Sequence, residues 1–160
     1  MEYSIDFAER LIDAADSFFE SPSDKNDAGR AVLYLSLLSC EISLKSLLES
    51  AGFTPDELKR RSHNLNGLLT DVCHCEIPDS RLGNFNSAAG LLAVQPISEA
   101  PNATVGKVLD AERDGASRYP NEVRYGDLIK HYSAPHVLDC AKAVSKWVRA
   151  NMDSIRKRSE

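Results

Sequence analysis

The stretch Ala31–Leu48 reads AVLYLSLLSCEISLKSLL and contains neither proline nor glycine. Its leucines recur at helical spacing, and most of the positions between them are apolar too. A helix that is apolar nearly all round is typical of the buried centre of a helical bundle. Two charges interrupt it, Glu41 and Lys45, which are four residues apart and therefore share one face of the helix. The pair is either a structural ion pair or part of a functional site.

The segments on both sides of this stretch predict further helices. Tyr3–Glu20 has one apolar stripe and one acidic face, the pattern of an amphipathic surface helix. Thr54, Pro55 and Glu57 form a helix-start signature, in which Glu57 lies three residues after the capping threonine. No internal repeat and no alternating strand pattern is apparent. The helices expected after the central one cover about Thr54–Arg61, His63–Cys75, Thr104–Ser117 and Ser133–Arg156.

Positions 77–103 break the helical pattern, because glycines, prolines and asparagines punctuate them. We interpret them as a long connector, in which Ala88–Val94 can form a short buried turn. The 160 residues suffice for one domain with a substantial core. The sequence therefore predicts a single domain, residues 1–160, with an all-α fold: an up-and-down antiparallel bundle of four or five helices.

Composition narrows the class of protein. The chain is 42% hydrophobic and 27% charged, as soluble globular proteins are. Its net charge of −5 argues against non-specific coating of nucleic acid but leaves room for a local basic site. The four cysteines are too few and too irregularly spaced for a disulfide scaffold. Because Glu41 and Lys45 interrupt the apolar run and no secretory signal is apparent, we expect a cytoplasmic protein that does not enter a membrane.

Five short motifs follow one another between the central helix and the last one. They are CEISLKSLL at Cys40–Leu48, Gly52 at the end of the central helix, HNL at His63–Leu65, the pair Leu68 and Leu69, and RYP at Arg118–Pro120. In this order and spacing the chain resembles the HEPN domain (higher eukaryotes and prokaryotes nucleotide-binding) over about positions 28–151.

The resemblance implies a helical bundle that frequently forms a homodimer. It also implies binding of a nucleotide or RNA, or association with a nucleotidyltransferase or antitoxin protein, and this is our leading interpretation. The alternative is a metal-independent endoribonuclease toxin, because some family members cleave RNA with an Arg and a His that pair across a dimer. Arg124 and His131, with six residues between them, match that motif. A third possibility is a structural or protein-interaction bundle without a ligand.

Two sets of residues are candidates for a site. Glu41 and Lys45 would line a polar pocket with three residues that the resemblance adds, His63, Arg118 and Tyr119. There the cations would hold a phosphate and Tyr119 would stack on a base. In the structural alternative, Glu41 simply pairs with Lys45 or Arg118 and orders the bundle.

The second set, Arg124 and His131, would be catalytic, with the histidine as general base and the arginine stabilising charge on the phosphate. Their seven-residue offset would place them on one face of a helix. Gly126 and the expected helix start at Ser133 favour a loop between them instead.

Metal ligation is a weaker candidate. His63, Cys73, His74 and Cys75 are all residue types that bind metals. However, ten residues of helix would separate His63 from Cys73 by about 15 Å. We therefore expect no metal site and no cofactor.

Overall fold

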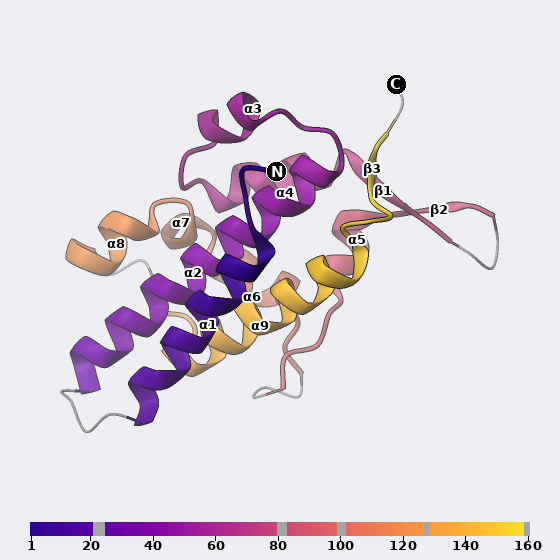
Figure 1. The fold of residues 1–160 in the computed structure, drawn as a ribbon. Helices are drawn as coiled ribbons and strands as arrows, with labels where there is room; N and C mark the ends of the chain where they lie inside the picture. Colours follow the sequence, from indigo (N-terminus) through magenta and orange to yellow (C-terminus); the bar gives the residue numbers. More distant parts are fainter. Residues whose placement is uncertain (21–24, 80–82, 99–101, 127–128, 159–160) are drawn as a thin grey trace.

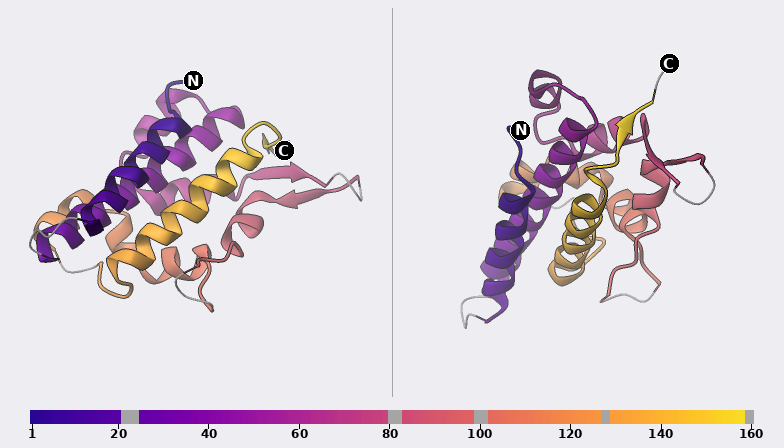
Figure 2. Two further views of the ribbon diagram at one scale, coloured as in Figure 1. Left: turned by 60° about the horizontal axis from the view of Figure 1, so that its bottom comes forward. Right: turned by 45° about the vertical axis from the view of Figure 1, so that its right-hand side comes forward.

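The longest helix, α2 (Lys25–Ser50), lies at the centre of the molecule (Figure 1). The computed structural model describes residues 1–20, 25–79, 83–98, 102–126 and 129–158. Helices α1 (Ile5–Glu20) and α9 (Ala134–Asn151) lie side by side with α2, as both views in Figure 2 show. Six shorter helices complete the described part: α3 (Pro55–Arg60), α4 (Leu65–Val72), α5 (Ala88–Ala93), α6 (Val105–Ala111), α7 (Arg113–Ala116) and α8 (Tyr119–Tyr125).

Contacts along the three long helices fix their directions. Lys142 near the middle of α9 pairs with Asp16, and Arg149 near its end pairs with Glu9, so α9 runs antiparallel to α1. The Ser39 hydroxyl of α2 donates to the Ala8 carbonyl at 2.9 Å. Since the start of α2 follows the end of α1, these two helices are antiparallel as well. It follows that α2 and α9 run in the same direction, which a simple up-and-down order of these three helices would not give.

A stripe of serines explains how closely α1 approaches α2. Ser36, Ser39, Ser43 and Ser46 are all fully buried and recur on one face of α2 at helical spacing. Ala8 and Ala15 of α1 are fully buried too. Small side chains on two facing helices let their backbones come close, and the bond from Ser39 to Ala8 is a direct result.

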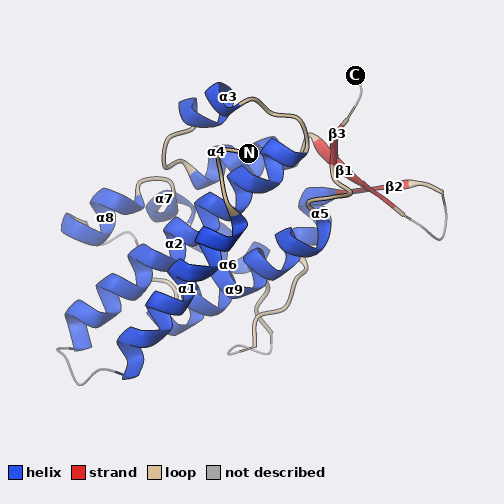
Figure 3. Ribbon diagram, viewed as in Figure 1, coloured by secondary structure: helices blue, strands red, loops and turns tan. Residues whose placement is uncertain are grey.

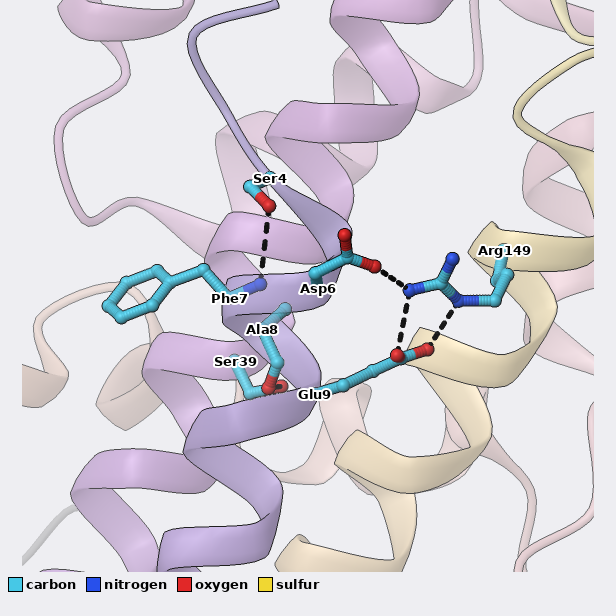
Figure 4. Close-up of polar contacts among 7 residues, drawn as sticks. All are labelled: Ser4, Asp6, Phe7, Ala8, Glu9, Ser39 and Arg149. Atoms are coloured by element: carbon cyan, nitrogen blue, oxygen red, sulfur yellow. Dashed lines mark hydrogen bonds and ion pairs between the residues drawn. The ribbon is translucent and has the colours of Figure 1, made fainter.

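Charged residues join α1 to α9 at the surface. The Arg149 guanidinium donates to both carboxylate oxygens of Glu9, at 2.6 and 2.7 Å, and also to Asp6 (Figure 4). An arginine that bonds both oxygens of one carboxylate forms a stronger ion pair than an arginine with a single bond. The acidic face of α1 therefore partly faces α9.

Several predicted helix ends are confirmed. Thr54 caps α3 in a complete capping box with Glu57, as the sequence signature indicates. Gly52 after α2 has a φ of +101°, the left-handed backbone that favours glycine. Ser133 directly precedes α9.

Other predicted boundaries are wrong. The helix expected over Thr104–Ser117 is two helices, α6 and α7, which meet at Glu112. A further helix, α8, begins at Tyr119 and has Pro120 in its first turn, where proline is well accommodated. The last helix ends at Asn151, five residues before the expected end.

The prediction of a mainly helical fold is confirmed, but the all-α class is wrong. Three short strands, β1 (Cys75–Pro78), β2 (Phe85–Ser87) and β3 (Arg156–Lys157), form an antiparallel sheet in the order β2-β1-β3 at one end of the molecule (Figure 3). Two of them and α5 lie in the region expected to be a connector, of which positions 80–82 and 99–101 lie outside the described residues. Ala88–Val94, expected as a short buried turn, contains α5.

By length and composition alone, Ala28–Ser50 is the one described helix able to cross a membrane. However, 67% of its most apolar stretch is buried inside the protein. The core helix of a soluble protein can have the same length and composition. Its place between α1 and α9 agrees with the predicted central helix. The cytoplasmic location stays a prediction.

Candidate functional site

Glu41 and Lys45 form the polar centre of the bundle. Each is at most 5% exposed, and Lys45 Nζ lies 2.7 Å from Glu41 Oε1. The same ammonium donates to the carbonyl oxygen of Ser62 at 2.8 Å. A buried charge is tolerated when it is paired and hydrogen-bonded, and both conditions are met here.

Two further side chains donate to the other oxygen of Glu41. Tyr119 Oη lies 2.7 Å and His63 Nδ1 2.9 Å from Glu41 Oε2. Tyr119 is fully buried, and burial followed by the charge of Glu41 raises the pKa of its phenol well above the usual value. The phenol therefore keeps its proton and acts as a donor. We call Glu41, Lys45, His63 and Tyr119 the Glu41 cluster.

The structure brings together four of the five residues predicted to line a pocket. Arg118 is the exception, because its guanidinium is mostly exposed and lies 3.9 Å from Glu122. The structural alternative in which Glu41 pairs with Arg118 is therefore wrong, whereas pairing with Lys45 is found. Three members of the Glu41 cluster are buried, and only the His63 side chain, 52% exposed, reaches solvent.

Backbone geometry and ring contacts fix the position of His63. The preceding residue, Ser62, has a φ of +49°, which is uncommon for a residue with a side chain. Lys45 holds the carbonyl of Ser62, and the His63 ring packs edge-on against Tyr119 at a centroid distance of 5.7 Å. Together with the bond to Glu41, these contacts orient an imidazole at the protein surface.

A shallow hollow of about 560 Å³ lies where the end of α1 and the start of α2 meet α8. Arg30 and Arg124 are exposed at it, and within the described residues neither guanidinium forms an ion pair. Phe18 and Tyr34 supply aromatic rings, and both rings are partly exposed. Its lining residues are Phe18, Arg30, Ala31, Tyr34, Leu35, Val123 and Arg124. We call this the α2–α8 hollow.

The Glu41 cluster and the α2–α8 hollow share one face of α2. Arg30, Tyr34, Glu41 and Lys45 follow one another at intervals of four, seven and four residues, so they form one stripe. Tyr119 at the start of α8 contacts Glu41 by its hydroxyl and Tyr34 by its ring, at a centroid distance of 5.6 Å. The Glu41 cluster thus holds α8 against α2, and the hollow forms beside this contact.

Arg124 and His131 lie on different elements. Arg124 belongs to α8, which ends at Tyr125, and His131 lies in the segment before α9. Positions 127–128 between them lie outside the described residues. The interpretation that places both on one helical face is therefore wrong, and the expected loop is found.

Glu112 is a buried charge that the sequence patterns did not single out. It is 1% exposed and accepts the backbone N–H groups of Lys130, His131 and Tyr132, at 3.2, 2.6 and 2.7 Å. This carboxylate fixes the segment that leads into α9. Its partners are 18 to 20 residues away in the chain, so no local sequence pattern predicts the contact.

The four predicted metal-ligand types are spread apart. His63 belongs to the Glu41 cluster, Cys73 and His74 are exposed at the end of α4, and Cys75 is buried in β1. Among the described residues, no group of three or more His, Cys, Asp or Glu side chains lies close enough to hold a metal ion.

We compared the chain with protein-family models, with curated proteins and with solved structures. None of them matches it.

Proposed function

We propose that the protein is a HEPN-like helical domain that binds a nucleotide or single-stranded RNA in the α2–α8 hollow. The observation that carries the proposal is the pair Arg30 and Arg124, two exposed guanidinium groups without an ion pair in the described chain, beside two aromatic rings. Arg61 and Arg149, by contrast, each pair with a carboxylate. Cations left without such a partner are available to an anionic ligand.

The chemistry of the hollow suits a phosphate attached to a base. A guanidinium presents a planar fork of donors that matches the oxygens of a phosphate. Tyr34 offers a ring face for a base, and stacking of this kind tolerates any base. Because the whole chain carries a net charge of −5, attraction to a polyanion would come from this local site.

In this proposal the Glu41 cluster has a positioning role. It fixes α8, and with it Arg124, against the face of α2 that carries Arg30 and Tyr34. Four of the five residues first expected to contact the ligand, all except Arg118, therefore support the site, with His63 as the member of the Glu41 cluster open to solvent. An endoribonuclease that uses Arg124 and His131 remains the alternative, and the two residues would then meet between two copies of the chain.

A homodimer belongs to the proposal, and α1 offers a self-complementary face for it. Phe7, Ala14 and Phe18 lie on one outer stripe of α1, and Phe7 and Phe18 are 49% and 36% exposed. Figure 4 shows Phe7 on the side of α1 away from Arg149. Two α1 helices packed antiparallel would place Phe7 of one copy against Phe18 of the other.

Titration of fluorescein-labelled single-stranded RNA into the protein tests the proposed ligand. We expect the Arg30→Gln and Arg124→Gln variants each to bind the RNA more weakly than the wild type, and Lys146→Gln on α9 to bind as the wild type does. Competition with a mononucleotide shows whether one nucleotide is enough. Equal binding by all four proteins, or no binding by the folded wild type, would contradict the proposal.

A further inference from the structure

A second pocket lies between α4, α5 and α6 and shares no lining residue with the α2–α8 hollow. Its volume is about 240 Å³, and the buried residues that line it include Leu92, Val105 and Leu109. From α4 it is lined by Leu69, the partly buried member of the leucine pair that the sequence motif contains. The lining is therefore mainly apolar, and we call this site the α4–α6 pocket.

Small residues let α5 and α6 pack closely beside the pocket. A Cβ atom on Gly106 of α6 would lie 2.9 Å from both the Cβ atom and the carbonyl oxygen of Ala93 in α5, so the two helices touch here. Ala89, Ala93 and Gly106 all line the pocket. Alanine and glycine have no rotamers to change, so this side of the pocket is preformed. A preformed surface of small groups suits a flat ring.

The polar groups at the pocket suit a neutral ligand with one hydrogen-bonding group. Asp110 and Arg113, the charged residues among those that line it, form an ion pair with each other. A charged ligand would lose its water here without gaining a free counter-charge. The exposed side-chain amide of Asn66 also lines the pocket and forms no hydrogen bond within the described chain. This amide can therefore bond a ligand.

The volume of the pocket limits the size of that ligand. An engineered apolar cavity of about 150 Å³ holds one benzene molecule. In proportion, about 240 Å³ holds roughly nine or ten non-hydrogen atoms, which is the size of two fused aromatic rings.

We infer that the α4–α6 pocket binds a small neutral aromatic compound with two fused rings and one N–H or O–H group. The rings lie between Leu69 and the small residues Ala89 and Ala93, and the polar group donates to Asn66 Oδ1. Indole has this size and one N–H group, so it is the probe of choice. The inference goes beyond the proposed function and does not depend on it.

Titration of indole, followed by saturation-transfer NMR and by the reactivity of Cys73, tests the inference. Cys73 reports on occupancy, because its exposed thiol lines the pocket. We expect saturable binding with a Kd of about 1 mM or below, and slower alkylation of Cys73 by iodoacetamide as indole is added. Adenine has a similar shape, but its ring nitrogens would lose their hydrogen bonds to water in an apolar pocket. It should bind at least about tenfold more weakly than indole.

Variants identify the pocket as the site of binding. Ala89→Leu on α5 and Thr70→Phe on α4 fill it from two helices, so each should bind indole at least about tenfold more weakly and lose the protection of Cys73. Val94→Leu is the matched control, because Val94 follows α5 but does not line the pocket. Asn66→Ala should bind indole about fivefold more weakly and 1-methylindole, which has no N–H, as the wild type does.

The contrary results are equally defined. A folded wild type without saturable binding of indole would overturn the inference. Binding that survives in either filled variant, once its circular dichroism spectrum shows that it folds, would overturn it as well, and so would adenine bound as tightly as indole. RNA binding through Arg30 and Arg124 is measured separately, so failure of one proposal leaves the other standing.

Discussion

The Tyr119 hydroxyl donates to the carboxylate of Glu41 at 2.7 Å, across 78 positions of the sequence. Both residues are buried, and the bond joins the start of α8 to the middle of α2. Lys45 and His63 donate to the same carboxylate. The charged pair that interrupts the central helix therefore connects α2 to two distant parts of the chain.

Removal of the Glu41 carboxylate should destabilise the fold. In Glu41→Ala the buried Lys45 loses its counter-charge and Tyr119 loses its acceptor, so we expect the free energy of unfolding to fall by about 3–5 kcal/mol. Urea unfolding followed by circular dichroism measures this. Asp153→Ala is the control, because Asp153 is exposed and forms no ion pair within the described residues. A loss no larger than that of the control would show that the Glu41 cluster does not hold α8.

Cysteine reactivity should follow burial. Cys73 is exposed, whereas Cys40, Cys75 and Cys140 are buried. Burial, with the nearby Asp71 carboxylate, raises the pKa of the Cys75 thiol to about 11. The hydrogen bond to Cys40 and burial raise the pKa of Cys140 well above its usual value. A raised thiol pKa means less of the reactive thiolate at a given pH.

Iodoacetamide at pH 8 should therefore modify one cysteine per chain in the native protein and four after denaturation. Mass spectrometry of tryptic peptides identifies the site, which we expect to be Cys73. Rapid modification of Cys75 in the native protein would contradict the burial of this side chain.

Self-association should depend on the outer stripe of α1. We expect the wild type to sediment as a dimer and Phe7→Glu as a monomer, because the new carboxylate would be buried against Phe18 of the second copy. Val94→Glu is the matched control, since Val94 is 65% exposed at the end of α5, away from α1. A wild-type monomer, or an equal loss of dimer in both variants, would rule out this interface.

Local sequence signals predicted the parts of the fold that local contacts determine. Thr54 and Glu57 bond within one turn, and Gly52 is needed for a left-handed backbone at one position. The strands have only two to four residues, too few for an alternating pattern, and their pairing joins Cys75 to Lys157 from the far end of the chain. Such long-range pairing leaves no local signal.

The sequence likewise indicated only part of the candidate site. The unusual position of Glu41 and Lys45 in an apolar helix indicated their contact, and the family resemblance supplied His63 and Tyr119. Arg118 was assigned wrongly, because adjacent residues at a helix start point in different directions: Tyr119 inward and Arg118 outward. Arg30 and Tyr34 are four residues apart and share a face of α2, but only the position of α8 shows that a hollow lies above them.

The salt dependence of RNA binding tests the proposed site most directly. For single strands, each phosphate contact contributes about 0.7 to the slope of log affinity against log salt. Arg30→Gln combined with Arg124→Gln should therefore lower the slope by about 1.4 and weaken binding at least about tenfold. A control of equal charge change, Lys146→Gln with Arg158→Gln, should keep the wild-type slope. Equal slopes in the two double variants would contradict a ligand site at the α2–α8 hollow.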